Sequence, residues 1–405
     1  MSKSTFFTGQ PIFSQLLNYI PSHIIADAVK EHSSDKYYKK FKSYDHLVTM
    51  LYTCFQKCEG IREVVTGLMA CHHKLCHLGL KYIPKRSTLS DANNGRSFEF
   101  FSSVYQRLYH HHYKCLPDSR IKGSIENRLF LIDSTTISLF TEIMKAMGSH
   151  PVNGKKKGGA KAHMMVKAAE DIPVFTMITH ATKNDKEIFK YITLPKGAIV
   201  VFDKGYNSYD QFAAWNKQSV TWVTRMSDVA YQEEIEKRTV SEKEKALGVI
   251  ADDWVILGRP GNAKTKRIKV RRITFYDAET KRTFYFITNT KRIKASVIAN
   301  IYKKRWQIEL LFKRLKQTYP LKHFLGESEN AIKTQIWCAL ITDLLLKIIK
   351  KYVKKVWAFS NISSMVRLHL MNYIKLLAFL ENPETALMNY KEPKTKQQLN
   401  LFSSA

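Results

Sequence analysis

The sequence predicts a mixed α/β protein of the α+β type: a core of strands and helices, interrupted by a β-rich insertion and flanked by helical N-terminal and C-terminal regions. Three observations lead to this prediction. Apolar residues recur at helical spacing in residues 1–122 and again from residue 295 onward. Strand-like and helical runs alternate in residues 123–225. In residues 226–284, strand-like runs follow one another without a helix between them.

The N-terminal region contains four runs in which apolar residues lie three and four positions apart, as on one face of a helix. These runs are Leu16–Val29, Tyr44–Cys58, Ile61–Cys71 and Phe98–His111. Residues 85–97, KRSTLSDANNGRS, are rich in Ser, Asn and Gly, and we expect a capped turn between helices there. Basic side chains flank the runs, so a DNA-binding region is one interpretation and a plain helical scaffold is the other.

The expected core begins with the apolar run LFLID, residues 129–133, and two more strands follow it with a turn at Glu170–Asp171. AIVVFD, residues 198–203, predicts a short buried strand, YDQFAAWNKQ a helix and SVTWVTRM another strand. Residues 148–161, GSHPVNGKKKGGAK, are rich in Gly and Lys. For this loop, contact with phosphates and a plain solvated linker are equally open.

The expected insertion begins with a polar stretch, and three strand-like runs follow it: DDWVILG, KRIKVRRITFYD and KRTFYFITN. Alternation in the second run puts four apolar residues nearly on one face, with a slip at Arg271–Arg272 that predicts a β-bulge. The four residues are Ile268, Val270, Ile273 and Phe275. Residues 285–325 are expected to return to the core, and residues 326–405 to form a helical C-terminal region.

The charge is strongly positive: 65 Lys and Arg against 35 Asp and Glu give a formal charge of +30 over 405 residues. An apolar fraction of 44% is ordinary for a globular protein and too high for a disordered basic tail. Such a chain favours a polyanionic partner, with nucleic acid the first candidate. No apolar run reaches the roughly 18 residues of a membrane span. The N-terminus lacks an apolar signal core, so we expect a cytoplasmic protein and no membrane partner.

A cluster of Cys and His residues between Cys54 and His77 resembles a zinc site only superficially. The spacing of Cys54 and Cys58 misses the Cys-x2-Cys pair that is usual in structural zinc sites, and both cysteines fall in a predicted helix. We therefore interpret them as packing residues with reduced thiols. The triplet His110–His112 is expected to be a solvated basic stretch.

Two carboxylates occupy the same kind of position in the predicted core. Asp133 ends the run LFLID and Asp203 ends AIVVFD, and small or turn-forming residues follow each of them. The carboxyl end of a buried strand is where α/β sheets present functional groups. Either residue alone could equally be a turn former or a helix cap. Two carboxylates in the same kind of position favour one shared functional site.

A third carboxylate belongs to a polar stripe on the predicted helix IYKKRWQIELLFKRLKQTYP. At about 100° per residue, four polar side chains fall within about 60° of one another at the edge of the apolar face. They are Tyr302, Arg305, Glu309 and Lys316. A salt bridge one turn long would explain Arg305 and Glu309 but not the alignment of the other two. Three carboxylates in a basic protein suggest a Mg²⁺ site that acts on phosphodiesters.

The spacing Tyr302-x2-Arg305-x3-Glu309-x6-Lys316 matches the Y-R-E-K signature of the DDE insertion-sequence transposases, in the insertion-sequence-four group. VFDKGY, residues 201–206, resembles the second-aspartate motif of that group, and LIDSTT, residues 131–136, its first. The resemblance covers roughly residues 125–320. It implies an RNase H-like catalytic core that carries a β insertion between the second aspartate and the glutamate.

The resemblance implies cut-and-paste transposition of an insertion sequence by metal-dependent hydrolysis and strand transfer. The metal ligands would be Asp133, Asp203 and Glu309, with two Mg²⁺ ions for which Mn²⁺ would substitute. Hydrolysis would free a 3′ hydroxyl that attacks the opposite strand to give a hairpin, which is then opened and joined to the target. The implied partners are double-stranded DNA, as terminal inverted repeats and target, and a second copy of the chain in a homodimeric, nucleoid-associated synaptic complex.

Other residues gain roles from the same resemblance. Phosphates near the scissile bond would be held by Tyr302, Arg305 and Lys316. In relatives, a Trp of the β insertion helps to hold a flipped base; Trp254 is the candidate here, and a buried strand Trp is the other interpretation. Lys161 and His163, on the strand expected to pair beside Asp133, are further candidates for the site.

Two alternative functions are a domesticated DNA-binding protein without catalysis and an RNase H-like nuclease that never joins strands. An inactive descendant would be expected to lose a metal carboxylate, and all three are present. The helical regions 1–122 and 326–405 suit end binding and subunit pairing, respectively. They favour transposition over simple nuclease activity.

Overall fold

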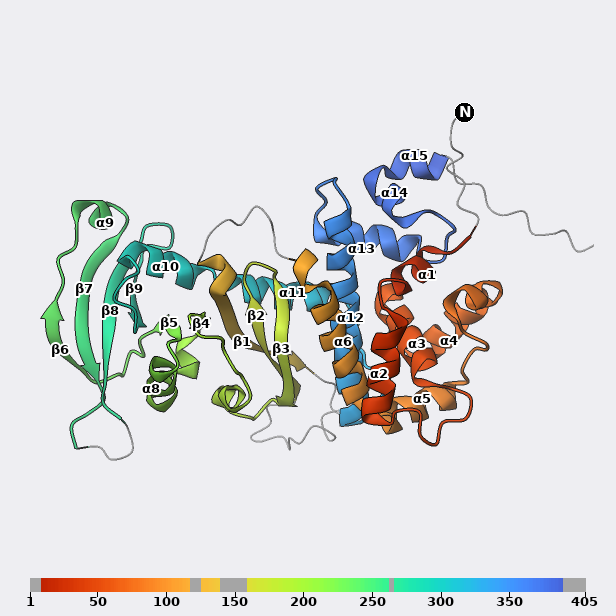
Figure 1. Cartoon of the computed structure of the whole chain (residues 1–405), viewed down its shortest axis with the longest axis horizontal. Helices are drawn as coiled ribbons and strands as arrows, with labels where there is room; N and C mark the ends of the chain where they lie inside the picture. The colour runs from red at the N-terminus through yellow and green to blue at the C-terminus, as the bar shows by residue number, and fades with distance from the viewer. Residues whose placement is uncertain (1–8, 117–124, 139–158, 262–265, 389–405) are drawn as a thin grey trace, which may run out of the picture. The chain divides into compact units, whose positions relative to one another are not determined.

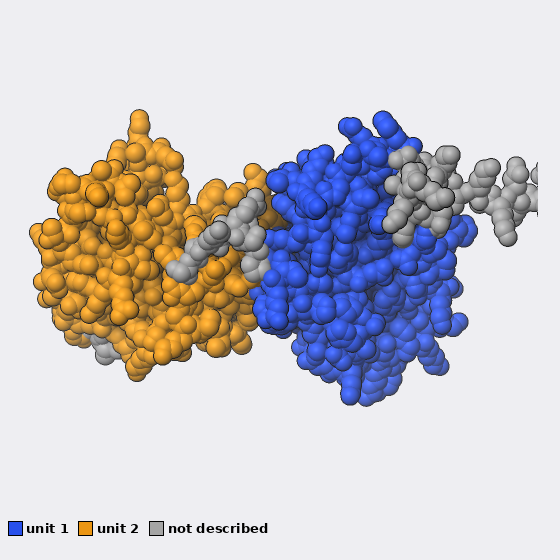
Figure 2. Space-filling view, turned by 45° about the horizontal axis from the view of Figure 1, so that its top comes forward, with its two compact units in different colours: residues 1–116, 315–405 blue, residues 117–314 orange. Residues whose placement is uncertain are grey.

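The computed structural model describes residues 9–116, 125–138, 159–261 and 266–388 (Figure 1). The chain divides into two compact units (Figure 2). Residues 1–116 and 315–405 form one, called the helical unit, and residues 117–314 form the other, called the sheet unit. The two helical regions that the sequence places at opposite ends of the chain therefore fold as one unit.

The helical unit is built around α12, Glu329–Tyr352, which is buried on nearly all sides between Ala331 and Ile349. α12 packs against α3, α5, α6 and α13. The helices of the unit are α1 Ile12–Leu17, α2 Ser22–His32, α3 Ser43–Gln56, α4 Ile61–Ala70, α5 Arg86–Gly95, α6 Phe98–His112, α12, α13 Phe359–Leu368, α14 Leu376–Glu381 and α15 Pro383–Met388, with 3₁₀ turns η1 His72–Leu78 and η2 Tyr113–Cys115. A helix that is apolar all round belongs in a core. No helix in the described ranges is long and apolar enough to cross a membrane.

Two predictions for this unit are wrong. Residues 85–97 contain the helix α5 rather than a turn, and its polar residue Asn93 is buried, with Oδ1 2.7 Å from Nε2 of His46 in α3. Ser and Asn favour turns because their side chains can bond to the nearby backbone, whereas Asn93 Oδ1 pairs with a residue of another helix. The prediction of a solvated triplet is wrong for His112, which is buried with its Nε2 3.0 Å from the carbonyl oxygen of Tyr19, whereas His110 and His111 are exposed as expected.

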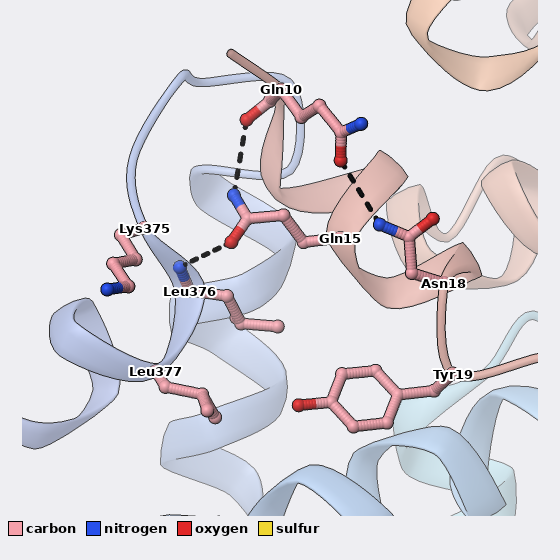
Figure 3. A pocket seen from close by; sticks show the side chains of 7 residues that line it. All are labelled: Gln10, Gln15, Asn18, Tyr19, Lys375, Leu376 and Leu377. Carbon is pink, nitrogen blue, oxygen red and sulfur yellow. Dashed lines mark hydrogen bonds between the residues drawn. The ribbon is translucent and has the colours of Figure 1, made fainter. Parts of the chain in front are cut away.

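Gln15 of α1 joins the first helix of the helical unit to the start of α14 (Figure 3). Its Nε2 donates to the carbonyl oxygens of Gln10 (3.1 Å) and Ile374 (2.7 Å), and its Oε1 accepts from the Leu376 amide (2.8 Å). These residues border a pocket of about 330 Å³. These bonds explain locally why α1 and α14, which are far apart in the sequence, lie in one unit.

The described part of the sheet unit contains one nine-stranded sheet with the order β3-β2-β1-β4-β5-β9-β8-β7-β6. The strands are β1 Leu129–Ser138, β2 Gly159–Lys167, β3 Ile172–His180, β4 Ile199–Phe202, β5 Thr221–Arg225, β6 Gln232–Lys237, β7 Val249–Leu257, β8 Ile268–Asp277 and β9 Arg282–Thr288. β1, β4 and β5 are parallel, and β2 and β3 add to the other edge of β1 in antiparallel fashion. This arrangement fits an RNase H-like core, and the predicted mixed α/β class is confirmed.

Helices and turns lie between the strands and after them. They are η3 Glu126–Arg128, η4 Asp185–Lys190, η5 Lys204–Tyr206, α8 Tyr209–Lys217, α9 Glu242–Ala246, α10 Ala295–Lys303 and α11 Trp306–Thr318. α8 is anchored in the apolar core of the sheet unit, where Phe212 stacks on Trp222 of β5 with ring centroids 4.0 Å apart. Trp215 of the same helix packs on Phe202 of β4. This packing holds α8 against the carboxyl end of β4 and the amino end of β5.

The strands of the expected insertion extend the core sheet, because β9 pairs with β5 in antiparallel fashion. Residue 284, where we expect the insertion to end, lies within β9. The bulge predicted at Arg271–Arg272 is absent from β8, which pairs with β9 without a register shift, and the bulge lies in β7 between Val249 and Ala251.

The apparent slip in β8 comes from a buried charge. Arg271 is 2% exposed and donates two hydrogen bonds to Asp252 of β7, at 2.7 and 2.8 Å. In an unbulged strand, side chains alternate between faces. Ile268 and Val270 therefore lie on the face opposite to Ile273 and Phe275, and the prediction that the four share one face is wrong.

Candidate active site

Asp133 and Asp203 lie beside each other on neighbouring parallel strands. In the β1–β4 pair, Ile132 is opposite Phe202, so the next residue of each strand brings the two aspartates to the same level. β1 continues past Asp133, whereas Asp203 directly follows β4. The parallel register thus places both carboxylates at the carboxyl end of β4, where open α/β sheets form their sites.

The polar stripe lies on two helices rather than on one. Tyr302 belongs to α10, and Glu309 lies in the first turn of α11. Between the helices, the Arg305 amide donates to the carbonyl of Tyr302 at 2.9 Å, a tighter turn than an α-helix makes. The single helix predicted for this run is therefore wrong, although three residues of its stripe still meet the aspartates.

Arg305 links two of the three carboxylates. Its Nη1 donates to Asp133 Oδ2 at 3.0 Å, and its Nη2 donates to Glu309 Oε1 at 2.5 Å. The Arg305 side chain is only 14% exposed, and its Nε is buried without a hydrogen-bond partner. The guanidinium therefore lies between Asp133 and Glu309 as their shared counter-charge.

Asp203 is held by two donors on the same oxygen. Arg225 Nη2 donates to Asp203 Oδ1 at 2.8 Å, and the Tyr302 hydroxyl donates to Oδ1 at 3.1 Å. Burial raises the pKa of Asp203, but the hydrogen bond and charge of Arg225 outweigh it and leave the pKa below its ordinary value. Sequence reasoning missed Arg225. The feature that could have indicated it is an Arg near the end of SVTWVTRM, the strand that follows the Asp203 strand in the sequence.

The pKa of Asp133 shifts in the opposite direction, upward. Burial raises its pKa to about 6, against the hydrogen bond from the Ser134 amide and the charge of Arg305, while Glu309 and Asp203 add to the rise. The carboxylates are therefore close enough to act on one another electrostatically. A carboxyl group whose pKa is strongly shifted by burial among other acids is a candidate functional group.

The donor set fits Mg²⁺, because this ion prefers carboxylate oxygens as ligands. Within the described ranges, however, no three His, Cys, Asp or Glu side chains form a group that could hold a metal ion. Arg305 lies between Asp133 and Glu309, and Arg225 and Tyr302 hold Asp203. The carboxylate oxygens are of the kind that Mg²⁺ prefers, and the guanidiniums of Arg225 and Arg305 occupy the positions next to them.

Lys161 and His163 lie on β2 beside β1, and their partner is a fourth carboxylate, Asp185. Lys161 Nζ lies 3.3 Å and His163 Nδ1 3.6 Å from Asp185 Oδ1, to which the Ser134 hydroxyl also donates at 2.7 Å. Burial lowers the pKa of His163 to about 4. The cluster borders Asp133 through Ser134. Sequence reasoning missed Asp185, which follows Asn184 in the loop after β3.

Trp254 is buried in β7, and the ammonium groups of Lys269 and Lys291 lie 5.3 and 5.8 Å from its ring centroid. A pocket of about 390 Å³ beside Tyr302 and Arg305 is lined by other aromatic residues. These are Phe275, Phe284, Phe286 and Trp306. The structure does not bring Trp254 into this pocket.

Two further predictions concern other parts of the chain. Lys316 lies in the part of α11 that belongs to the helical unit, where burial lowers the pKa of its ammonium group. Of the Gly- and Lys-rich loop at 148–161, residues 148–158 lie outside the described residues.

Comparison with known proteins identifies the family. The model of the transposase DDE domain matches residues 125–344, more than half of the chain. The chain belongs to the DDE transposases. A second model, a domain of unknown function (DUF4372), matches residues 8–81. The predicted enzyme class is thereby confirmed, and the two aspartates and the glutamate lie within the matched range.

Named relatives agree with this assignment. A putative transposase, y4zB, from Sinorhizobium fredii is 33% identical over 266 residues, which cover 65% of this chain and 71% of that protein. A probable transposase for insertion sequence element IS5377 from Geobacillus stearothermophilus is 25% identical, with 60% and 62% covered. A putative transposase for element IS4SA from Synechocystis sp. is 27% identical, with 65% and 71% covered. The predicted insertion-sequence transposase is confirmed, and the insertion-sequence-four group fits these relatives.

Proposed function

We propose that this insertion-sequence transposase binds the terminal inverted repeats of its element, cleaves the element ends through a hairpin, and joins them to target DNA. The observation that carries the proposal is the meeting of Asp133 and Asp203 in parallel register, with Glu309 joined to Asp133 through Arg305. Three carboxylates from three separate segments meet in a chain of charge +30. This is the chemistry that metal-dependent cleavage of a polyanion needs.

In this proposal, Asp133, Asp203 and Glu309 hold two Mg²⁺ ions, for which Mn²⁺ substitutes. When bound, such ions activate the attacking oxygen and stabilise the leaving one. Arg305 and Tyr302 bind the phosphates next to the scissile bond, since a guanidinium offers paired donors to phosphate oxygens. Lys316 holds a phosphate of the entering strand.

The helical regions serve assembly in the same proposal. Residues 1–122 bind the ends of the element, and residues 326–405 contribute to a homodimer in the synaptic complex. The positive charge of the chain supplies affinity for DNA without sequence preference. Both regions belong largely to one compact helical unit, so in this proposal end binding and dimerisation use the same unit.

The test is incubation of the full chain with end fragments of its own element and Mg²⁺, with products separated on a denaturing gel. Hairpin ends followed by joined products support the proposal. Nicking without hairpins or joining would indicate an RNase H-like nuclease, and binding without cleavage would indicate a DNA-binding protein without catalysis.

A further inference from the structure

Arg225 is placed beside Asp203 by the sheet itself. In the parallel β4–β5 pair, Val201 is opposite Val223, so two residues further along each strand Asp203 and Arg225 lie at the same level. On its other side, Arg225 pairs with Phe286 of β9. Its carbonyl oxygen also accepts a hydrogen bond from Asn207 Nδ2 at 2.9 Å. The backbone of Arg225 is therefore held by its pairing with β9 and by the hydrogen bond from Asn207.

The side chain of Arg225 is the second guanidinium, after Arg305, that lies next to the carboxylates. Its guanidinium carbon lies 5.8 Å from the centroid of the Tyr302 ring, and that of Arg305 lies at the same distance. Arg225 binds Asp203, and Arg305 binds Asp133 and Glu309. Two guanidiniums thus face three carboxylates, with Tyr302 beside both.

The two arginines and a divalent cation need the same oxygen atoms. A cation that approaches Asp203, Asp133 and Glu309 must displace the hydrogen bonds of the guanidiniums or share the oxygens with them at a cost in repulsion. Both arginines also carry an Nε that is buried and has no hydrogen-bond partner. These donors are available to a new acceptor such as a phosphate oxygen.

We propose that Arg225 is a further residue of the active site, which with Arg305 acts as counter-cation for the three carboxylates until DNA phosphates draw both guanidiniums away. Metal binding is then coupled to DNA binding. By thermodynamic linkage, DNA raises the affinity for the metal by the same factor by which the metal raises the affinity for DNA. The inference rests on the proposed function, because it takes Asp133, Asp203 and Glu309 as metal ligands.

The experiment measures Mn²⁺ binding to the full chain by electron paramagnetic resonance, with and without end DNA. Arg225→Gln removes the charge and keeps a hydrogen-bond donor, whereas Arg225→Lys keeps the charge. Without DNA, the Gln variant is expected to bind Mn²⁺ about tenfold more tightly than the wild type, which corresponds to about 1.4 kcal/mol. The Lys variant should stay near the wild type. Cleavage by the Gln variant should fall, so binding and cleavage change in opposite directions.

Arg238→Gln is the matched control. The Arg238 side chain is 33% exposed, against 32% for Arg225, and it pairs with Asp252 at 3.7 Å on the insertion strands. Its removal should leave Mn²⁺ affinity unchanged. End DNA should raise the Mn²⁺ affinity of the wild type and have a smaller effect on Arg225→Gln, in which one counter-cation is already gone.

The outcomes separate this inference from the proposed function. If Asp203→Asn weakens Mn²⁺ binding while Arg225→Gln leaves it unchanged or weaker, the inference is wrong and the proposed metal ligands stand. If Asp203→Asn leaves Mn²⁺ binding unchanged, the proposed metal site itself is wrong. Thermal unfolding shows whether each variant is folded. Arg305→Gln repeats the test at Asp133 and Glu309 and decides the matter should Arg225→Gln fail to fold.

Discussion

Replacing Asp133 by Asn is expected to stabilise the metal-free protein, although it removes a proposed metal ligand. Burial, with smaller contributions from Glu309 and Asp203, raises the pKa of Asp133 to about 6 against the opposing effects of Ser134 and Arg305. The folded state therefore prefers a neutral carboxyl group more strongly than the unfolded chain does. Asn has nearly the same shape and no charge, so it removes the unfavourable ionisation.

The magnitude follows from the size of the shift. The pKa rises from 3.8 to about 6, roughly two units, and each unit corresponds to about 1.4 kcal/mol. The Asp133 side chain is 17% exposed, so water screens little of the effect. Arg305 loses one charged partner in the variant, which reduces the gain. We expect the free energy of unfolding to rise by about 1–3 kcal/mol above pH 6.

The sign of the effect fixes its pH dependence. A carboxyl group with a raised pKa destabilises the folded state only where it is ionised. The difference between Asp133→Asn and the wild type should therefore be small near pH 3.8, grow up to about pH 6 and stay constant above it. Urea unfolding in the presence of a chelator measures this difference at several pH values.

Asp253→Asn is the matched control. Asp253 is also buried, but Arg272 pairs with it at 2.7 Å. Its replacement leaves Arg272 without that partner and should destabilise the protein. An Asp133→Asn protein that is no more stable than the wild type above pH 6, or a difference that does not change between pH 4 and 6, would refute the reasoning.

Four further outcomes are expected. Asp203→Asn and Glu309→Gln should each abolish Mg²⁺-dependent cleavage and leave DNA binding intact in a gel-shift assay; near-normal cleavage by either variant would remove that residue from the metal ligands. Binding to end DNA should weaken with salt, with log K falling by about 0.9 per neutralised phosphate for each tenfold rise; a flat response would contradict phosphate contact. Lys316→Ala should reduce hairpin formation or joining more than Lys313→Ala, and equal activities would contradict a phosphate contact at Lys316. Arg271→Met should lower the free energy of unfolding by about 3–5 kcal/mol, because it leaves a buried carboxylate without its main partner; urea unfolding within 1 kcal/mol of the wild type would contradict this.

Local patterns were enough to predict most strands of the core, and they failed where a distant partner decides the structure. β4, β5 and the first half of β1 are short apolar runs, a pattern that can be recognised without knowledge of the neighbouring strands. The sequence analysis did not predict β6, Gln232–Lys237. All six of its residues are exposed, and apolar and polar residues do not alternate along it. In α5, the Oδ1 atom of Asn93 pairs with His46, a residue that no local window contains.

The site shows the same limit. Asp133 and Asp203 could be predicted because each ends an apolar run, and Glu309 because of its motif. Arg225 could not, since its relation to Asp203 depends on the register of two parallel strands that are joined by α8. The break between α10 and α11 was also hidden, because the turn at Arg305 keeps helical spacing in the sequence.

The distribution of charge explains why the three carboxylates are not equivalent. Two guanidiniums leave one negative charge without a counter-charge, and the contacts decide where it lies. Arg225 and the Tyr302 hydroxyl both donate to Asp203, and the pKa of Asp203 is lowered. Asp133 shares Arg305 with Glu309 and is the more buried of that pair, with 17% of its side chain exposed against 32%. The uncompensated charge therefore falls on Asp133, and in the proposed site a metal ion would gain most from binding there, because it would supply the counter-charge that the two guanidiniums leave missing.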